Sequence, residues 1–355
     1  MRFLIQHCRY GLILVLCFVI MTITPAQDNT AMVELAQGNT AFAFDLYHTI
    51  QQNVEGNIIF SPYSISSALA MTVAGARGET ERQMRQTLHF SLPPERLHPA
   101  FRVLDLELAS RADAAGTDPN DDWQGLKLNI ANAIWAQQGF PFRTDYLRLL
   151  EENYGAGMRP VDFAGAPNDS RIEINDWVAE QTEDRIQDLI PPSLIPPDTT
   201  LVLTNAIYFN ATWLSPFNAT NTQDDDFTLL DDSRVAVPMM KQIMHYPLVD
   251  QKEYIAVELP YSGEEVSLLI LMPNRDNFSE FEQELSPRIL DGIISKMEET
   301  TISLHVPKLE GEFDVSLSDA LVEMGMRDAF GAADFSGMSN EDGLFISEVL
   351  HKAFL

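Results

Sequence analysis

Cysteine is almost absent from this sequence. The chain has 355 residues, of which only Cys8 and Cys17 are cysteine. Both lie within residues 1–26, which have the pattern of a signal peptide that is removed on export. The expected mature chain, residues 27–355, therefore has no cysteine, which excludes disulfides, cysteine nucleophiles and thiolate metal ligands for that chain.

The N-terminal segment has the three parts of a secretory signal. Arg2 and Arg9 supply a basic start, residues 11–23 form a short apolar run, and residues 24–26 provide small side chains for cleavage. A membrane-spanning helix needs about 20 apolar residues, so an uncleaved anchor is the less favoured alternative. We expect a secreted protein, extracellular or periplasmic, without membrane contact once the signal is removed.

Basic residues are scarce as well. The chain has 23 Lys and Arg against 52 Asp and Glu, which gives a formal net charge of -29. Such an acidic surface repels phosphate and sulfate groups, which argues against nucleic acid, heparin-like polyanions and anionic lipid as partners. High solubility is the simplest consequence of this charge.

Signatures of catalysis are missing. The sequence has no HExxH, GxSxG, GxGxxG or P-loop pattern, and its seven histidines are scattered. Ser347 and His351 stand four apart in a strand-like run, too far for a bond between a nucleophile and its base. Residues 224–226 are three aspartates, which we interpret as a solvated turn. We expect no enzyme, with no catalytic residues, no cofactor and no bound metal.

Hydrophobic periodicity indicates a mixture of helices and long strands. Predicted helices cover residues 31–52, 168–184 and 316–326, and predicted strands cover residues 200–209, 254–261, 266–273 and 300–315. Because helices and strands do not alternate strictly, the fold class is α+β. We find no repeat and no low-complexity tract, and we expect residues 27–355 to form a single domain.

Two helix starts carry capping signals. Ser61 can cap a helix whose first residue is Pro62, and Thr80 and Gln83 have the spacing of a capping box. In the helix predicted over residues 168–184, the residues expected to pack inward are Ile172, Ile174 and Val178.

Four polar residues occur where the pattern indicates burial. Asn205 interrupts the apolar run LVLTNAIYF, His351 interrupts SEVLHKAF, and Ser61 and Ser64 begin an otherwise apolar helix. A buried polar group must find hydrogen-bond partners or it costs a few kcal/mol. Either the four groups are satisfied separately, or they share one network that joins two strands to a helix.

Several ordered motifs resemble one family, the serpins. The segments NIIFSPYSISSALAMTVAGARGET, LVLTNAIYFNATW and LFISEVLHKAF carry the resemblance, together with VELPY, LLILMP and VPKLEGEFDVSLSDALVEMGMRDAF. They follow in the family's order with suitable spacing, and the resemblance runs from about residue 31 to the last residue. Independent motifs in the right order make a chance match improbable.

The resemblance implies an α+β serpin fold with three β-sheets and about eight or nine helices. Most serpins inhibit serine endopeptidases, and some inhibit cysteine endopeptidases, by a suicide mechanism. An exposed reactive loop is attacked as a substrate: its scissile peptide bond breaks and the loop acylates the protease. The loop then inserts into the central sheet, which distorts the protease. The resemblance thus implies a target endopeptidase as partner, acting on a monomeric inhibitor. The alternative is a non-inhibitory serpin with a carrier, chaperone or storage role.

The resemblance also implies roles in conformational change. The family's shutter, a polar cluster beneath the sheet centre, corresponds to Ser61, Ser64, Asn205 and His351. The breach at the top of the sheet, where insertion starts, corresponds to Trp213. The segments expected in the opening sheet are residues 126–136, 158–163, 200–211, 305–313 and the run from about 345.

The sequence departs from the family pattern at its end. In serpins the segment after HKAF supplies the hinge, the reactive loop and the last strands, and this sequence stops at Leu355. We therefore expect a chain that is truncated before the reactive loop, has no reactive site of its own and lacks the last strands. As given, it is expected to be inactive, while the full-length parent is the inhibitor.

Overall fold

The computed structural model describes residues 13–14, 30–54, 56–114, 126–155, 158–192 and 194–355. Of the expected signal peptide, residues 1–26, it describes only Ile13–Leu14, so the signal and the domain boundary at residue 27 stay predictions. The chain falls into two compact units, which are described separately. The larger unit comprises residues 25–109, 128–209 and 311–355, and the smaller unit comprises residues 1–24, 110–127 and 210–310.

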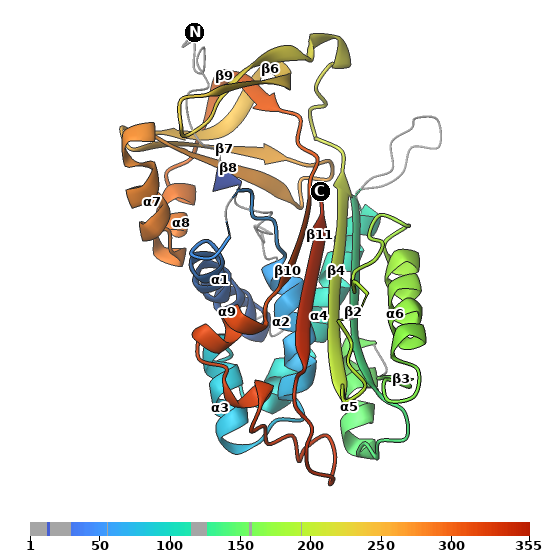
Figure 1. Cartoon of the computed structure of the whole chain (residues 1–355). Helices are drawn as coiled ribbons and strands as arrows, with labels where there is room; N and C mark the ends of the chain where they lie inside the picture. Colours follow the sequence, from blue (N-terminus) through green and yellow to red (C-terminus); the bar gives the residue numbers. More distant parts are fainter. Residues whose placement is uncertain (1–12, 15–29, 55, 115–125, 156–157, 193) are drawn as a thin grey trace. The chain divides into compact units, whose positions relative to one another are not determined.

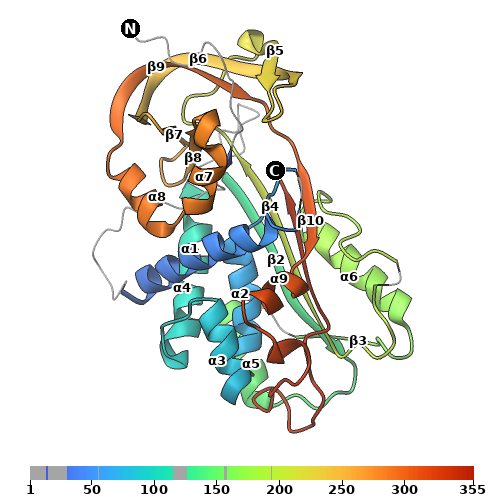
Figure 2. The ribbon, with the colours of Figure 1, turned by 60° about the vertical axis from the view of Figure 1, so that its left-hand side comes forward.

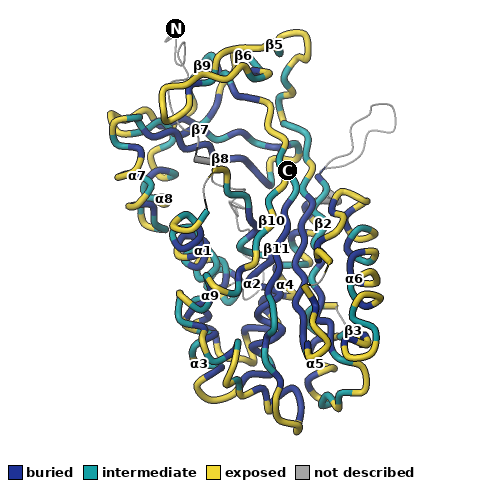
Figure 3. Tube along the Cα trace, in the orientation of Figure 1, coloured by how far each residue is buried: buried dark blue, intermediate teal, exposed yellow. Residues whose placement is uncertain are grey.

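A five-stranded sheet forms the centre of the larger unit (Figure 1). Its strands, in spatial order, are β10 (Glu312–Ser316), β11 (Glu348–Phe354), β4 (Leu201–Ala211), β2 (Leu126–Gln137) and β3 (Arg159–Val161). β11 is antiparallel to β10 and parallel to β4. The burial pattern in Figure 3 is darkest along β4, β11 and the helix behind them, so the core of this unit lies on the middle of the sheet.

Helices cover both faces of this sheet. One face is crossed by α6 (Pro167–Gln181), and the helices of the other side include α2 (Pro62–Val73) (Figures 1 and 2). The remaining helices of this unit are α1 (Thr30–Ile50), α3 (Gly78–Thr87), α4 (Pro94–Ala114), α5 (Thr144–Tyr154), α9 (Ser318–Glu323) and the 3-10 turn η3 (Asp328–Phe330). Every residue of α2 from Ser64 to Val73 is buried.

The two capping predictions have different outcomes. The Ser61 side chain accepts a hydrogen bond from the Ser64 N–H at the start of α2, and Pro62 is the first helical residue, as predicted. The prediction of a capping box at Thr80 and Gln83 is wrong, because α3 begins at Gly78 and has no side-chain cap. Their side chains instead accept backbone N–H groups of a distant segment, Thr80 from Asp334 and Gln83 from Arg327 and Asp328. Tertiary contacts therefore outcompeted the local cap.

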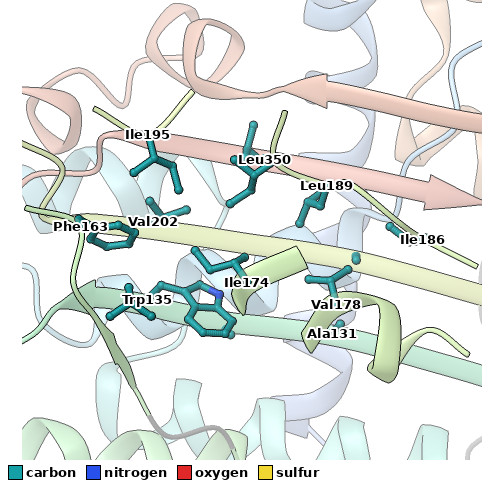
Figure 4. Close-up of a cluster of buried hydrophobic side chains, with 14 residues drawn as sticks. Ala131, Trp135, Phe163, Ile174, Val178, Ile186, Leu189, Ile195, Val202 and Leu350 are labelled. Atoms are coloured by element: carbon teal, nitrogen blue, oxygen red, sulfur yellow. The ribbon is translucent and has the colours of Figure 1, made fainter. Parts of the chain in front are cut away.

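A cluster of buried side chains holds α6 and the segment after it to the sheet (Figure 4). Ile174 and Val178 of α6 are fully buried in it, as predicted. Ile172 is not, since 41% of its surface remains exposed, which corrects the expectation that it packs inward. The fully buried Trp135 of β2 lies in the same cluster, and its indole N–H donates to the Thr204 hydroxyl of β4 at 2.9 Å.

The smaller unit contains a six-stranded sheet. Its main order is β1 (Ile13–Leu14), β8 (Ser267–Pro273), β7 (Tyr254–Pro260), β6 (Arg234–Asp250) and β5 (Gln223–Thr228), and β9 (Glu298–Pro307) also pairs with β6. The helices are α7 (Phe278–Glu284) and α8 (Pro287–Ile294), with 3-10 turns η1 (Ala219–Asn221) and η2 (Arg275–Asn277). The predicted hairpin at Ser262 and Gly263 joins β7 to β8.

Two expectations about the sheets need correction. The described residues form two sheets where three were expected, because the 17-residue β6 pairs with β5, β9 and β7 in turn and so joins their ladders. The segment 305–313, expected in the sheet that opens, is divided. Residues 305–307 end β9 in the smaller unit, and β10 begins only at Glu312. The nine α-helices of the described residues agree with the expected number.

The packing of α6 gives a matched pair of substitutions. Ile174→Ala removes a fully buried side chain and should lower the free energy of unfolding by about 2–5 kcal/mol. Ile172→Ala, in the same helix but exposed, should change it by less than about 0.5 kcal/mol. Urea unfolding followed by circular dichroism measures both. Equal losses in the two variants would show that α6 does not pack on the sheet through Ile174.

Candidate functional site

The four polar residues singled out in the sequence meet at one place in the larger unit. His351 Nδ1 lies 2.5 Å from the Asn205 side-chain oxygen, and the Asn205 amide donates to the Ser64 hydroxyl. The Ser61 backbone N–H donates to His351 Nε2 at 3.2 Å. All four residues are at most 5% exposed. They form one shared network, and of the two alternatives left open by the sequence this is the one that the structure contains.

A fifth member was missed by the sequence analysis. The Asn205 amide also donates to the Asn132 side-chain oxygen at 2.5 Å, and the Asn132 amide donates to the Ser64 carbonyl at 3.1 Å. The signal was present, because Asn132 is a polar residue within the strand pattern LNIANAIWA. The network therefore connects four segments of the fold: the strands β2, β4 and β11 and the first turn of α2.

The hydrogen bonds define the protonation state of His351. Because the Ser61 N–H points at Nε2, that nitrogen must accept, so the ring proton resides on Nδ1 and is donated to Asn205. Burial lowers the pKa of His351 to about 3, and its hydrogen bond with Asn205 opposes this shift only in part. A second ring proton would face the Ser61 N–H, which is also a donor. The network therefore requires a neutral imidazole.

The network lies across the contact between β4 and β11. These strands run parallel and are directly paired from Glu348 with Val202 to Phe354 with Tyr208, with His351 opposite Asn205. We call this contact the seam. The contact rests on the backbone ladder and, at the centre, on the side-chain bond between His351 and Asn205.

Side chains also connect the two strands of the seam to their neighbours on the face that carries α6. The Lys352 ammonium is 2.6 Å from a carboxylate oxygen of Glu312 on β10 and donates to the Gln187 carbonyl at 3.0 Å. Gln187 belongs to the connection that follows α6. In the same connection the Arg185 guanidinium lies 5.6 Å from the ring centre of Tyr208 and 6.0 Å from that of Phe354. This connection thus contacts side chains from both strands of the seam.

Trp213, the expected breach residue, belongs to the smaller unit. Its ring stacks on Tyr261 with centroids 4.5 Å apart and an interplanar angle of 11°, and Phe217 contacts it edge-on at 6.2 Å. A backbone bridge between Trp213 and Tyr261 fixes the pair further. The breach role of Trp213 and the shutter role of the four network residues stay predictions.

The imidazole of His351 is fully occupied within the network. Both ring nitrogens of His351 are engaged by Ser61 and Asn205, so this imidazole is not available to activate the Ser347 hydroxyl. Among the described residues no group of His, Cys, Asp and Glu is placed to hold a metal ion. None of the helices in the described ranges is long and apolar enough to cross a membrane.

Comparison with known proteins identifies the family. Residues 37–355 match the family model described as serpin (serine protease inhibitor). The chain belongs to the serpin family. An uncharacterized serpin-like protein of Thermococcus kodakarensis is 38% identical over 89% of this chain and 71% of its own length. The leukocyte elastase inhibitor of Xenopus tropicalis is 36% identical over 91% of this chain and 86% of its own length.

Solved serpin structures have the same fold. Uncleaved ovalbumin superimposes with a TM-score of 0.82 at 29% identity, covering 90% of this chain and 84% of ovalbumin. Human thyroxine-binding globulin, solved as a complex with thyroxine, gives a TM-score of 0.80 at 28% identity, covering 92% of this chain and 86% of the globulin. The serpin fold predicted from the motifs is confirmed.

Removing the imidazole should destabilise this serpin in a pH-dependent way. His351→Ala leaves the buried Asn205 short of a partner and should lower the free energy of unfolding by about 1–3 kcal/mol at pH 7.5. Since the ordinary histidine pKa is about 6.5 and that of His351 is lowered to about 3, its contribution is complete above pH 6.5. It is lost progressively as the pH falls from there toward 3. The deficit of the variant should therefore shrink by pH 4.5.

Chemical unfolding at both pH values measures this difference against the wild type. The comparison is needed because His98, also buried, has its pKa lowered to about 4 and adds its own acid sensitivity to both proteins. The exposed His245 supplies a control, and His245→Ala should change stability little at either pH. A His351→Ala deficit that is the same at pH 7.5 and 4.5 would contradict a neutral, buried imidazole.

Proposed function

We propose that this chain carries the sheet of a secreted, serpin-type inhibitor of serine endopeptidases, with cysteine endopeptidases as the alternative target class. Support comes from membership of a family described as serine protease inhibitors and from relatives named as elastase inhibitors. The signal-like pattern of residues 1–26 supports export. The chain acts on its target by conformational change and catalyses no reaction itself.

The observation that carries this proposal is the seam. Two parallel strands, β4 and β11, are direct neighbours at the centre of the sheet, and no further strand lies between them. A strand that entered here antiparallel to both would make two antiparallel ladders in place of one parallel ladder. Antiparallel pairing is slightly more stable per residue, and the new strand would satisfy its own backbone groups. Insertion therefore gives a net gain in hydrogen bonding.

The side-chain contacts across the seam determine how much free energy is needed to open it for insertion. Opening must break the bond between His351 and Asn205 and move the Arg185 connection away from Tyr208 and Phe354. A buried network of this kind is strong when complete and costly when half satisfied. We propose that it keeps the sheet closed until the cleaved reactive loop supplies the inserting strand.

A carrier function is the second candidate. Thyroxine-binding globulin, whose name states what it binds, is among the similar structures. The two functions differ in what happens when a protease meets the protein. An inhibitor traps the protease in a covalent adduct, whereas a carrier is cleaved and releases it.

The first test is adduct formation. The product of the complete gene, and residues 1–355 alone, are incubated with trypsin-like, chymotrypsin-like and elastase-like serine endopeptidases and examined on denaturing gels. We expect an SDS-resistant adduct with one of these enzymes for the complete gene product, and none for residues 1–355. Cleavage of the complete product without any adduct would refute inhibition of these enzymes and favour a carrier. An adduct formed by residues 1–355 would refute the expected inactivity.

The second test addresses the seam itself. An extended peptide of about 12 small residues, alternating Thr and Ala, is added in excess to residues 1–355. Insertion as a new central strand should raise the melting temperature by at least about 5 °C. A peptide of the same length with Pro at alternate positions cannot donate ladder hydrogen bonds and should have no effect. An unchanged melting temperature with the first peptide, or an equal rise with both, would contradict an openable seam.

A further inference from the structure

The smaller unit contains a small cavity, and of its lining residues only Trp213 has been given an expected role above. Its volume is about 130 Å³. The side chains that give it chemical character are Trp213, His245, Tyr246, Glu264 and Glu299. Engineered cavities of about 150 Å³ hold a molecule the size of benzene. This cavity therefore has room for one planar or compact group.

The aromatic part of the lining is held rigidly. The Trp213 ring is fixed by its stack on Tyr261, and the Tyr246 hydroxyl accepts a hydrogen bond from the Gln242 amide. That amide also donates to the Ser215 carbonyl at 3.1 Å, and Ser215 is itself part of the lining. Because these groups are already placed, a ligand would not need to order them.

The two carboxylates of the lining come from separate segments. Glu264 lies in the turn between β7 and β8, where its N–H donates to the Tyr261 carbonyl at 3.1 Å. Glu299 lies on β9 opposite Pro247 of β6. Both side chains are exposed at the surface, and within the described part of the chain neither forms an ion pair. Their charge is therefore available to a ligand.

We propose that this cavity binds a single guanidinium or alkylammonium group. Aromatic faces attract cations, Trp most strongly, and a planar guanidinium stacks on such a ring while it donates to carboxylates. The net charge of -29 draws cations toward the protein and repels anions. The cation can be a free small molecule or an arginine or lysine side chain of a peptide. The inference does not depend on the proposed inhibitory function.

The test is a titration that varies ligand charge at constant ligand shape. Residues 1–355 are labelled with nitrogen-15 in the tryptophan side chains, and the indole signal of Trp213 is identified as the one missing in Trp213→Phe. Methylguanidinium and its neutral isostere methylurea are then added separately at pH 8, where imidazoles are neutral. We expect methylguanidinium to shift the Trp213 signal with an affinity about tenfold above that of methylurea. Equal shifts, or no shift with either, would overturn the proposal.

Three variants locate the charge that is responsible. Glu264→Gln and Glu299→Gln should each weaken methylguanidinium binding about three- to fivefold. Glu298→Gln removes an exposed charge of the neighbouring β9 residue that does not line the cavity, and it should weaken binding less than twofold. If all three variants weaken binding equally, the cation is attracted by the overall charge and the cavity is not its site.

A last comparison identifies the source of the cation. A short peptide with one arginine is compared with the same peptide carrying citrulline, the neutral isostere of arginine. Binding of the arginine peptide at least as tightly as methylguanidinium supports a protein or peptide side chain as the natural occupant. Binding of methylguanidinium alone supports a free small cation. Equal binding of the arginine and citrulline peptides would overturn the proposed charge recognition.

Discussion

The direct parallel pairing of β4 with β11 is the constraint on which the larger unit depends. Its centre is a buried polar bond, His351 to Asn205, which is supported by Ser61, Ser64 and Asn132. An apolar pair at this position would add only contact area to the backbone ladder, and its contribution would weaken gradually as the strands separate. A buried hydrogen-bonded pair is satisfied in one geometry. When the strands are partly separated, its donor and acceptor lack partners, and this costs free energy. The paired arrangement of β4 and β11 is therefore the one in which the buried network is fully satisfied.

The two faces of the seam use different chemistry. On the face of α2 the network is neutral, since burial keeps His351 uncharged, and it is bonded to a helix that is itself buried. On the face of α6 the contacts are charged and lie nearer the surface. Lys352 reaches Glu312 and the Gln187 carbonyl, while Arg185 lies over two aromatic rings. The network on the face of α2 requires a neutral imidazole, whereas the contacts on the face of α6 depend on the connection that follows this helix.

The sequence predicted much of the fold and most of the network, for identifiable reasons. Long periodic elements such as α1 and β4 were recognised because each repeats one signal over many residues. Asn205 and His351 were recognised because a polar residue in an apolar run requires a partner. The predictions were wrong where contacts with a distant segment determined how a residue packs or bonds. Thr80 and Gln83 have the spacing of a local cap but bond residues near 330, and Ile172 has helical spacing but lies beyond the edge of the buried cluster.

By itself, then, the sequence determined the serpin family, the α+β class, the acidic surface and the identity of four polar residues that need partners. These properties follow from residue type and spacing along one segment at a time. Tertiary structure alone decided which strand lies beside which, that Asn132 completes the network, and that β6 joins its partners in one sheet. It also decided that two glutamates from separate segments share a cavity with Trp213. Such facts depend on contacts between residues far apart in the chain, and the spacing within a segment holds no information about them.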